Sequence, residues 1–362
     1  MISSSVLPDL MALALRGALV IANLPDKKPT MADVAARAGV SRSLVSTVFR
    51  DVPGASPVTR ERVLKAAVDL GYQIDNHARM LRRRRTHMLG VIFQIQYAFH
   101  SDLVEAMYPA AETVGYDLVL SAATARRTEL DAAEQLLRDR CEALVFVGPQ
   151  MAEVKLAELA SQVPIIVTSR RISHPALDLV MTSDKEVVKM ALGHVASLGH
   201  TNIAHLDGAK ILGAIDRRRW YRNIMKQRDL GEFIQILEGG NTEIEGIRAA
   251  ETLVRYTTAL PSAVICFNDS VAIGFMFGLR RAGVRVPGDV SLVGYDDIHM
   301  SGLPFISLTT VGQDVTATAK GAVEHALSRL DRAVRPGVTW VSPYLIRRST
   351  TQPARQQALP LG

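Results

Sequence analysis

Residues 30–48 read TMADVAARAGVSRSLVSTV, and this stretch predicts two short helices joined by a tight turn. Thr30 and Asp33 have the spacing of a capping box, which starts a helix by satisfying free backbone N–H groups. Gly39 is placed to end that helix, because glycine adopts the left-handed conformation that a helix C-terminus needs. Ser41 is then placed to cap the second helix.

The second of these helices should have one face suited to nucleic acid. We expect it to extend to about residue 50, with Leu44, Val45 and Val48 facing inward. The opposite face carries arginines and short hydroxyl side chains, which allow close approach to a DNA groove and can bond phosphates or bases. The residues of this polar face are Arg42, Ser43, Ser46, Thr47 and Arg50.

A third helix should support this pair. Ser56 is placed to cap it, Pro57 stands at its first position, and Gly71 ends it. Two short helices joined by a turn, with a third packed against them, form a helix-turn-helix, although a three-helix bundle without a DNA role is the alternative. The expected inward face of the third helix consists of Val63, Leu64, Ala67 and Leu70.

The positive charge of the chain is concentrated around this module. The protein has 362 residues and a net charge of +6 at pH 7. Residues 1–87 hold 14 basic and 7 acidic side chains, whereas the remaining 275 residues hold 28 and 29. A basic module on a neutral body is typical of a polyanion-binding protein, although a solubilising basic tail gives the same count. Four consecutive arginines at 82–85 repel one another, which favours either a segment that orders on DNA or a solvated linker.

From residue 88 onward, apolar runs of strand length alternate with amphipathic stretches of helix length. Strands separated by helices of this length predict parallel sheets. About 260 residues are too many for one sheet, so we expect two α/β lobes. Such folds bind ligands at the carboxyl ends of their strands, and a cleft between two lobes is a natural site. The expected strands are residues 88–95, 116–120, 143–147, 165–168, 203–206, 233–237, 263–267 and 290–293.

Polar groups follow three of these strands, in the motifs Asn268-Asp269 and Asp296-Asp297 and at Arg217. Carboxylate, amide and guanidinium groups that meet at strand ends suit the hydroxyl groups of a sugar. A helix cap is the alternative interpretation of each motif taken alone. The aromatic residues that could cover the apolar face of such a sugar are Tyr97, Phe99 and Trp220.

The sequence shows no motif for catalysis, a cofactor or a metal. Glycine-rich nucleotide motifs, metal-ligand spacings and the Gly-x-Ser-x-Gly nucleophile motif are all missing, so we expect no enzyme activity and no cofactor. Cys141 and Cys266 lie in apolar runs, which predicts reduced core thiols. No run approaches the ~18 apolar residues of a membrane helix, and Leu10–Ala22 lacks the features of a signal peptide. We therefore expect a cytoplasmic protein without membrane contact.

Several motifs resemble the lactose-repressor/galactose-repressor (LacI/GalR) family. The run at 30–48, SPVTRERV at 56–63 and LGY at 70–72 resemble its DNA-binding domain. LGHTNIA at 198–204, FND at 267–269, VPGDVSLVGYDD at 286–297 and LTTVGQ at 308–313 resemble its sensor domain. The resemblance extends to about residue 349. It implies an all-α helix-turn-helix headpiece followed by a two-lobed α/β domain of the periplasmic-binding-protein-like fold.

The resemblance also implies a function for the matching positions. The protein would be a homodimeric repressor that binds double-stranded operator DNA and responds to a small molecule, a sugar or sugar derivative. Base-reading positions would be Arg42, Ser43 and Thr47. Positions that contact the DNA backbone or set a helix on it would be Thr30, Ser41, Ser46, Ser56, Thr59 and Tyr72. Ala78 and Leu81 match the hinge helix, whose leucine wedges into the minor groove. Effector-binding positions would be Tyr97, Phe99, Arg170, Arg217, Trp220, Asn268 and Asp296.

The chain departs from the family pattern in its hinge and its cleft. Ile74-Asp75-Asn76 replaces the usual Pro-Asn-Ala at the start of the hinge, and Trp220 replaces a glycine, which would reshape the pocket. In the second lobe, Ser183-Asp184 replaces Asp-Asn and Val187 replaces a glycine.

The expected organisation follows the family. It consists of an extension at 1–29, a helix-turn-helix domain at 30–72, a hinge at 73–87, a two-lobed domain at 88–349 and a tail at 350–362. The first lobe would take residues 88–178 and 310–340 and the second 179–309 and 341–349, with the chain crossing near 178, 310 and 340. A solute-binding protein without a DNA role and a sugar-acting enzyme are the alternatives.

Overall fold

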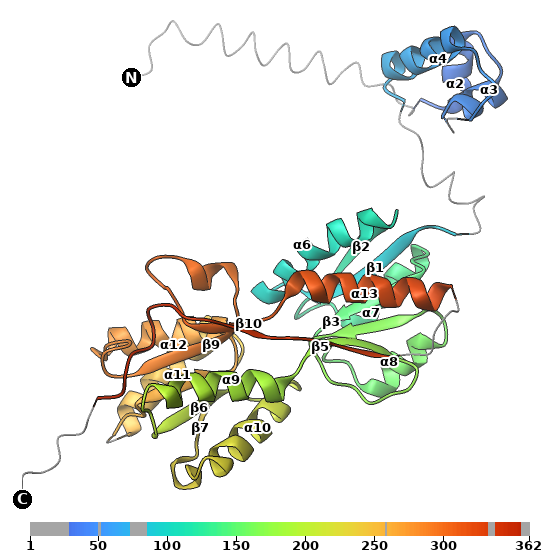
Figure 1. The fold of residues 1–362 in the computed structure, drawn as a ribbon. Coiled ribbons are helices and arrows are strands. Elements are labelled where there is room, and N and C mark those ends of the chain that lie inside the picture. Colours follow the sequence, from blue (N-terminus) through green and yellow to red (C-terminus); the bar gives the residue numbers. More distant parts are fainter. Residues whose placement is uncertain (1–28, 50–51, 73–84, 258, 332–336, 356–362) are drawn as a thin grey trace, which may run out of the picture. The chain divides into compact units, whose positions relative to one another are not determined.

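The computed structural model describes residues 29–49, 52–72, 85–257, 259–331 and 337–355. The chain divides into two units, residues 1–84 and residues 85–362, and each is described by itself (Figure 1). The first unit contains the predicted helix-turn-helix, and the second contains the predicted pair of α/β lobes.

Three helices form the described part of the first unit: α2 (Met31–Ala38), α3 (Arg42–Phe49) and α4 (Pro57–Leu70). The predicted start and stop signals are present. Thr30 and Asp33 form the capping box, and Gly39 and Gly71 adopt left-handed φ angles of 61° and 62° after α2 and α4. The three helices share a small aliphatic core formed by Val34, Ala35, Ala38, Val45, Val48, Val63, Ala66 and Ala67.

One residue of the expected core lies on the surface. Leu64 was expected to face inward, but its side chain is 46% exposed. Val63, Ala66 and Ala67 are buried instead and follow the i, i+3, i+4 spacing of one helix face. Leu64 is one residue, about 100° of helix rotation, away from Val63, which turns it toward solvent.

The first lobe of the second unit is built on a six-stranded parallel sheet. Its strands are β1 (Met88–Gln94), β2 (Asp117–Ala123), β3 (Ala143–Val147), β4 (Ile165–Thr168), β5 (Asp178–Thr182) and β11 (Val338–Val341), in the order β11-β5-β4-β3-β1-β2. Helices α6 (Ala98–Thr113) and α13 (Val315–Leu330) pack side by side, and α7 (Glu129–Arg138) and α8 (Glu153–Ala160) complete the layers (Figure 1). The central strands are buried along their whole length, as parallel strands covered by helices should be.

The second lobe repeats this architecture. Its strands are β6 (Ile203–Asp207), β7 (Gln235–Glu238), β8 (Ala263–Cys266), β9 (Ser291–Asp296), β10 (Thr310–Gly312) and β12 (Tyr344–Ile346), in the order β12-β10-β9-β8-β6-β7. Only the β10–β12 pair is antiparallel. The flanking helices are α9 (Asp184–Ser197), α10 (Ala214–Gln227), α11 (Glu243–Tyr256) and α12 (Asp269–Arg281), with short 3₁₀ turns η1 (Gly231–Phe233) and η2 (His299–Gly302).

The lobe boundaries differ from the predicted ones by a few residues. β5 belongs to the first sheet and β10 to the second, so the chain crosses between lobes after Thr182, Gly312 and Val341. The expected crossings near 178 and 310 were therefore early. Each strand has to complete its ladder of hydrogen bonds before the chain can leave the sheet, and these short strands carried no period-two pattern to mark them.

The predicted tail is also shorter than expected, because its first residues belong to the second lobe. Thr350 is only 1% exposed, and its hydroxyl donates to the Leu292 carbonyl at 2.9 Å and accepts the Thr309 N–H at 2.9 Å. The Ala354 N–H donates to the Leu198 carbonyl at 2.8 Å. Backbone and hydroxyl groups rather than apolar side chains hold this segment, so hydrophobic patterning could not reveal it.

Both cysteines are buried and unpaired, as predicted. Burial raises the pKa of the Cys141 thiol to about 12 and also raises that of Cys266. Among the described residues, no helix is long and apolar enough to cross a membrane. Nor does any group of three or more His, Cys, Asp or Glu residues in this part of the chain lie close enough together to hold a metal ion.

Candidate functional site

The N-terminal end of α3 presents its polar side chains on the surface of the first unit. Arg42 and Ser43 are exposed, and Ser46 and Thr47 are half-buried. The Ser41 hydroxyl accepts the Leu44 N–H at 3.2 Å, which begins the helix, and lies 2.9 Å from the Ser43 hydroxyl. The predicted base-reading residues therefore share the exposed side of one rigid helix.

Three of the predicted backbone-contacting residues are helix caps. The hydroxyls of Thr30, Ser41 and Ser56 each accept an N–H from the first turn of the helix that follows them. Helix N-termini carry partial positive charge and free N–H groups, which makes them natural partners of a phosphate. The Thr59 hydroxyl lies 2.9 Å from that of Ser56, and Tyr72 stacks on Phe49 with ring centroids 5.6 Å apart.

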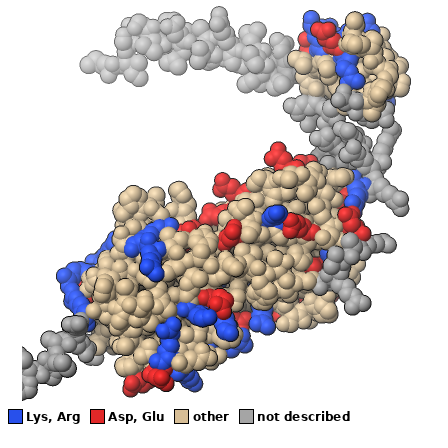
Figure 2. Space-filling model, viewed as in Figure 1, with Lys and Arg blue, Asp and Glu red and all other residues tan. Residues whose placement is uncertain are grey.

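Little of the positive excess lies on the helices themselves. The described residues up to 72 carry five basic and three acidic side chains, which alternate on the visible face of this unit (Figure 2). Most of the excess is in the arginine-rich segment that follows. The hinge positions Ala78 and Leu81, and the departures at 74–76, lie outside the described residues.

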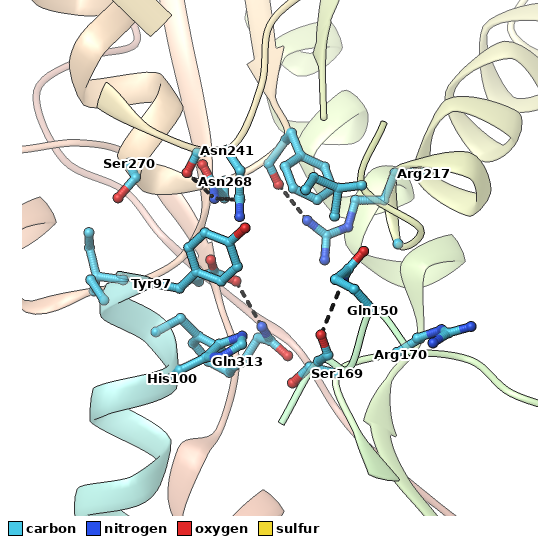
Figure 3. A pocket seen from close by; sticks show the side chains of 18 residues that line it. Tyr97, His100, Gln150, Ser169, Arg170, Arg217, Asn241, Asn268, Ser270 and Gln313 are labelled. Atoms are coloured by element: carbon cyan, nitrogen blue, oxygen red, sulfur yellow. Dashed lines mark hydrogen bonds between the residues drawn. The ribbon is translucent and has the colours of Figure 1, made fainter. Parts of the chain in front are cut away.

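A cleft of about 690 Å³, including its open mouth, separates the two lobes of the second unit (Figure 3). The carboxyl ends of strands from both sheets lead into it, as predicted for the fold. Its lining comprises Tyr97, Ala98, Phe99, His100, Gly148, Gln150, Ser169 and Arg170 from the first lobe; Ile211, Gly213, Arg217, Asn241, Phe267, Asn268, Ser270, Asp296 and Ile298 from the second; and Gln313 at a crossing.

Arg217 projects from the first turn of α10 and is held on several sides. Its Nε lies 2.8 Å from Asp184 Oδ1, and another nitrogen donates to the Phe267 carbonyl. The guanidinium also lies over the rings of Tyr295 and Phe267, 3.8 and 4.6 Å from their centroids. A guanidinium held in this way is preorganised to donate into the cleft.

Of the adjacent residues Asn268 and Asp269, the first lies in the cleft and the second in the core. Asn268 lines the cleft and also caps α12, because its Oδ1 accepts the Val271 N–H at 2.9 Å. The helix-cap interpretation of this motif is therefore confirmed, and Asn268 also lies in the lining of the cleft. Asp269 is completely buried and accepts hydrogen bonds from the Ser301 and Thr310 hydroxyls, each at 2.6 Å.

The Asp296-Asp297 pair divides in the same way. Asp296 lines the cleft, and its Oδ1 accepts the Gln313 side-chain amide at 2.8 Å. Burial raises the pKa of Asp296 well above its usual value, although Arg217 opposes this shift. Asp297 instead pairs with Arg348 at 2.6 Å, outside the cleft lining.

The first-lobe wall contributes neutral hydrogen-bonding groups. The Gln94 N–H donates to His100 Nδ1 at 3.1 Å, so the proton of the neutral ring lies on Nε2. Burial lowers the pKa of His100 to about 4, which keeps the ring neutral. Arg170 donates to the Pro149 and Met151 carbonyls, so its charge holds the loop of the wall.

One predicted cleft residue lies elsewhere. Trp220 is not part of the lining; its ring lies 5.4 Å from both Lys185 Nζ and the Arg219 guanidinium. It stands one turn further along α10 than Arg217, and therefore farther from the strand ends. Helix geometry carries this large side chain out of the cleft.

Six polar lining residues are not among the predicted effector positions: His100, Gln150, Ser169, Asn241, Ser270 and Gln313. Gln150 and Ser169 follow β3 and β4, where the rule that ligands bind at carboxyl strand ends could have found them. Gln150 also crosses the cleft, because its Oε1 accepts the Leu212 N–H at 3.3 Å. Gln313 ends the family motif LTTVGQ at 308–313, which marked the segment but not a place in the cleft, and nothing near Asn241 distinguished it from an ordinary loop residue.

Asp269 gives a prediction about pH. Burial raises its pKa to about 7, although bonds from Ser301, Thr310 and the Ile298 N–H favour ionisation. The folded protein therefore holds a proton that the unfolded chain releases above about pH 4, and the free energy of unfolding falls as pH rises from about 4 to 7. Relative to Asp269→Asn, the parent should lose about 2 kcal/mol between pH 5 and pH 7 in denaturant titrations. Parallel profiles for the two proteins would show that Asp269 is ionised throughout.

A helix-turn-helix unit followed by a two-lobed α/β unit with a polar cleft defines a ligand-responsive DNA-binding regulator. Residues 30–75 match the model of the lacI family of bacterial regulatory proteins, and residues 192–351 match the periplasmic binding protein-like domain. The HTH-type transcriptional regulator GalR of Salmonella typhimurium is 34% identical over 325 residues, covering 88% of this chain and 95% of GalR. The chain belongs to the LacI family of transcriptional regulators, which are not enzymes.

Other relatives agree with this membership. The HTH-type transcriptional repressor PurR of Vibrio campbellii is 28% identical over 89% of this chain and 98% of its own. A LacI transcriptional regulator from Rhodococcus is 39% identical with a TM-score of 0.72, over 74% of this chain and 99% of that one. The lac repressor dimer bound to operator and the anti-inducer ONPF is 25% identical with a TM-score of 0.79, over 90% of this chain and 100% of that one. Because a bacterial transcriptional regulator acts on DNA, the predicted location in the cytoplasm is confirmed.

Proposed function

We propose that this regulator is a homodimeric repressor whose operator affinity is controlled by an uncharged sugar or sugar derivative in the interlobe cleft. The observation that carries the proposal is the charge balance of the cleft. Arg217 is paired with Asp184 and lies near Asp296, and Arg170 is bonded to backbone carbonyls. The other polar lining groups are amides, hydroxyls and a neutral imidazole, which suit the hydroxyls of a sugar.

The proposed effector contacts follow from this geometry. Arg217, Asn268 and Asp296 hold the hydroxyls from the second lobe, while Tyr97 and Phe99 cover an apolar sugar face from the first. His100, Gln150, Asn241 and Gln313 extend this set beyond the sequence prediction. Binding changes operator affinity by the difference in effector affinity between two lobe arrangements, commonly about 1–3 kcal/mol.

The proposed DNA contacts use the α3 surface. Arg42, Ser43 and Thr47 read bases, and the helix ends capped by Thr30, Ser41 and Ser56 meet phosphates, helped by Ser46, Thr59 and Tyr72. The similarity to the lac repressor dimer bound to operator supports a dimer on a two-part site. The proposed domains are residues 30–72 for reading, 73–87 for the hinge and 88 to about 354 for sensing.

A thermal-shift panel tests the effector assignment. Neutral sugars, sugar acids and nucleobases are tested with the whole protein, and a neutral sugar should raise the melting temperature. At a hundredfold excess over Kd the added stability is about 2.7 kcal/mol. Asp296→Asn should abolish the shift, because it removes a carboxyl group that faces the cleft.

Asp297→Asn is the matched control. It removes the neighbouring carboxylate, which pairs with Arg348 outside the cleft lining, so it should change stability but keep the sugar-induced shift. A shift that survives Asp296→Asn would contradict the pocket assignment. A panel in which only charged compounds bind would contradict the neutral-sugar assignment.

A further inference from the structure

The Glu142 carboxylate contacts several groups at the start of the second unit. Its Oε1 accepts the backbone N–H groups of Thr86 and His87, the latter at 3.0 Å. Its Oε2 accepts the Tyr116 hydroxyl at 3.0 Å and lies 4.0 Å from Arg85 Nε. The side chain is only 11% exposed. Residues 85–87 are the described end of the predicted hinge at 73–87, so this carboxylate holds the point where the hinge joins the second unit.

Neighbouring contacts tighten the same junction. The Thr86 hydroxyl donates to the Arg140 carbonyl at 2.8 Å, and Arg85 pairs with Asp331 at 3.0 Å. His87 has a φ of 57°, a left-handed conformation that a residue other than glycine rarely adopts, and its ring lies 4.9 Å from that of Tyr116. Strain of this kind persists only where the surroundings impose it. We call Glu142 and its contacts with residues 85–87 and Tyr116 the junction clasp.

Two paired strands run from the junction clasp to the cleft. β1 begins at Met88, directly after the clasp, and β3 begins at Ala143, directly after Glu142. The two strands are hydrogen-bonded neighbours with Leu89 opposite Ala143, and they span ~20 Å toward the cleft. Leu89, Val91 and the whole of β3 are buried, so the two strands are closely packed along their length.

A second carboxylate holds the cleft end of the same strands. Glu129 accepts the side-chain amide of Gln94, at the end of β1, at 3.1 Å. It also accepts the backbone N–H groups of Gln150 and Met151, beyond the end of β3. Gln150 in turn accepts the Leu212 N–H of the opposite lobe. The strands β1 and β3 are therefore held by a carboxylate at each end, Glu129 beside the cleft and Glu142 at the hinge junction.

We propose that Glu142 is a positioning residue for operator binding: it fixes the hinge to the first lobe, so that lobe movement at the cleft resets the start of the hinge. Glu142 touches neither DNA nor effector in this proposal. Tyr116 acts with it as the donor of the clasp. Burial, together with the bond to Glu142, raises the pKa of Tyr116 to about 12, so this donor keeps its proton across the physiological range.

The test compares operator affinity in Glu142→Ala and Glu134→Ala. The probes are a DNA fragment from upstream of the regulator's own gene and a scrambled fragment of equal length. Both variants lose one negative charge, which by electrostatics alone should strengthen DNA binding. Glu134 lies on the solvent-facing side of α7, where its side chain is 55% exposed and pairs with Arg138 at 3.9 Å. We expect Glu134→Ala to bind like the parent or slightly tighter, and Glu142→Ala to bind the operator fragment at least tenfold more weakly.

Further readouts separate positioning from stability. Affinity of Glu142→Ala for the scrambled fragment should match that of Glu134→Ala, and the slope of affinity against salt should stay unchanged, because no phosphate contact is lost. Trypsin should cleave the Arg85–Thr86 bond faster, as followed by mass spectrometry, at an unchanged melting temperature. Tyr116→Phe removes one bond of the clasp and keeps the carboxylate, so it should weaken operator binding two- to threefold.

Either of two results would overturn the proposal. One is operator binding by Glu142→Ala and Tyr116→Phe that equals or exceeds that of the parent. The other is an equal loss on both DNA fragments accompanied by a lower melting temperature, which would assign Glu142 to fold stability alone. If Glu142→Ala does not fold, Tyr116→Phe decides between these outcomes.

Discussion

Replacing Gly274 by alanine is expected to destabilise the second lobe by about 3 kcal/mol. Gly274 lies in α12 where that helix meets α11. A Cβ atom at this position would stand 1.9 Å from the Glu243 carbonyl oxygen and 2.7 Å from Glu243 Cα. These are backbone atoms, so no side-chain rotation relieves the overlap. In the same way, a Cβ atom added to Gly246 of α11 would stand 2.2 Å from the Val271 carbonyl oxygen. The two helices therefore approach each other through glycines.

Denaturant unfolding followed by circular dichroism measures this effect. Gly193→Ala is the matched control, because Gly193 also lies within a helix of the second lobe but a Cβ there would meet only the end of the Arg228 side chain at 3.5 Å. Since alanine favours helix more than glycine does, Gly193→Ala should be neutral or stabilise the protein by up to ~1 kcal/mol. Equal effects of the two substitutions would contradict the close packing of α11 and α12.

Replacing Arg42 by alanine is expected to weaken operator binding by about 1–3 kcal/mol, roughly 10- to 100-fold. Arg42 is exposed at the first position of α3, next to the capped N-terminus. From this position its guanidinium can bond two acceptors on one base edge, which alanine cannot replace. Fluorescence anisotropy with the operator fragment and a scrambled fragment measures both affinity and specificity. The loss should be larger on the operator than on the scrambled DNA.

Arg37→Ala is the control for lost charge. Arg37 lies in the last turn of α2, is 61% exposed and pairs with Asp69 at 3.8 Å. Its removal changes the net charge of the headpiece by the same amount, but we place it outside the reading surface. We therefore expect a smaller loss, similar on both DNA fragments. Equal and non-specific losses for the two variants would show that Arg42 contributes charge without reading bases.

The sequence determined the local features of this protein, because each depends on groups only a few residues apart. The hydroxyl–carboxylate spacing of Thr30 and Asp33 predicted the start of α2, and Gly39 predicted its end. Alternation of apolar runs of strand length with helix-length stretches predicted two sheets of mostly parallel strands, since each element is read from its own few residues. Resemblance then added the class of regulator, which neither charge nor periodicity could have supplied.

Only the tertiary structure decided which polar side chains face the cleft. Asp296 and Asp297 are adjacent and chemically identical, but their φ angles of 118° and 60° turn them apart, and Arg348, 51 residues away, pairs with the second. Asp269 is drawn into the core by Thr310, 41 residues away, while Asn268 beside it reaches the cleft. The segment 350–354 and the junction clasp likewise depend on partners distant in sequence. The local sequence pattern places a side chain on a helix or strand. Residues that folding brings together from distant parts of the chain decide what that side chain contacts.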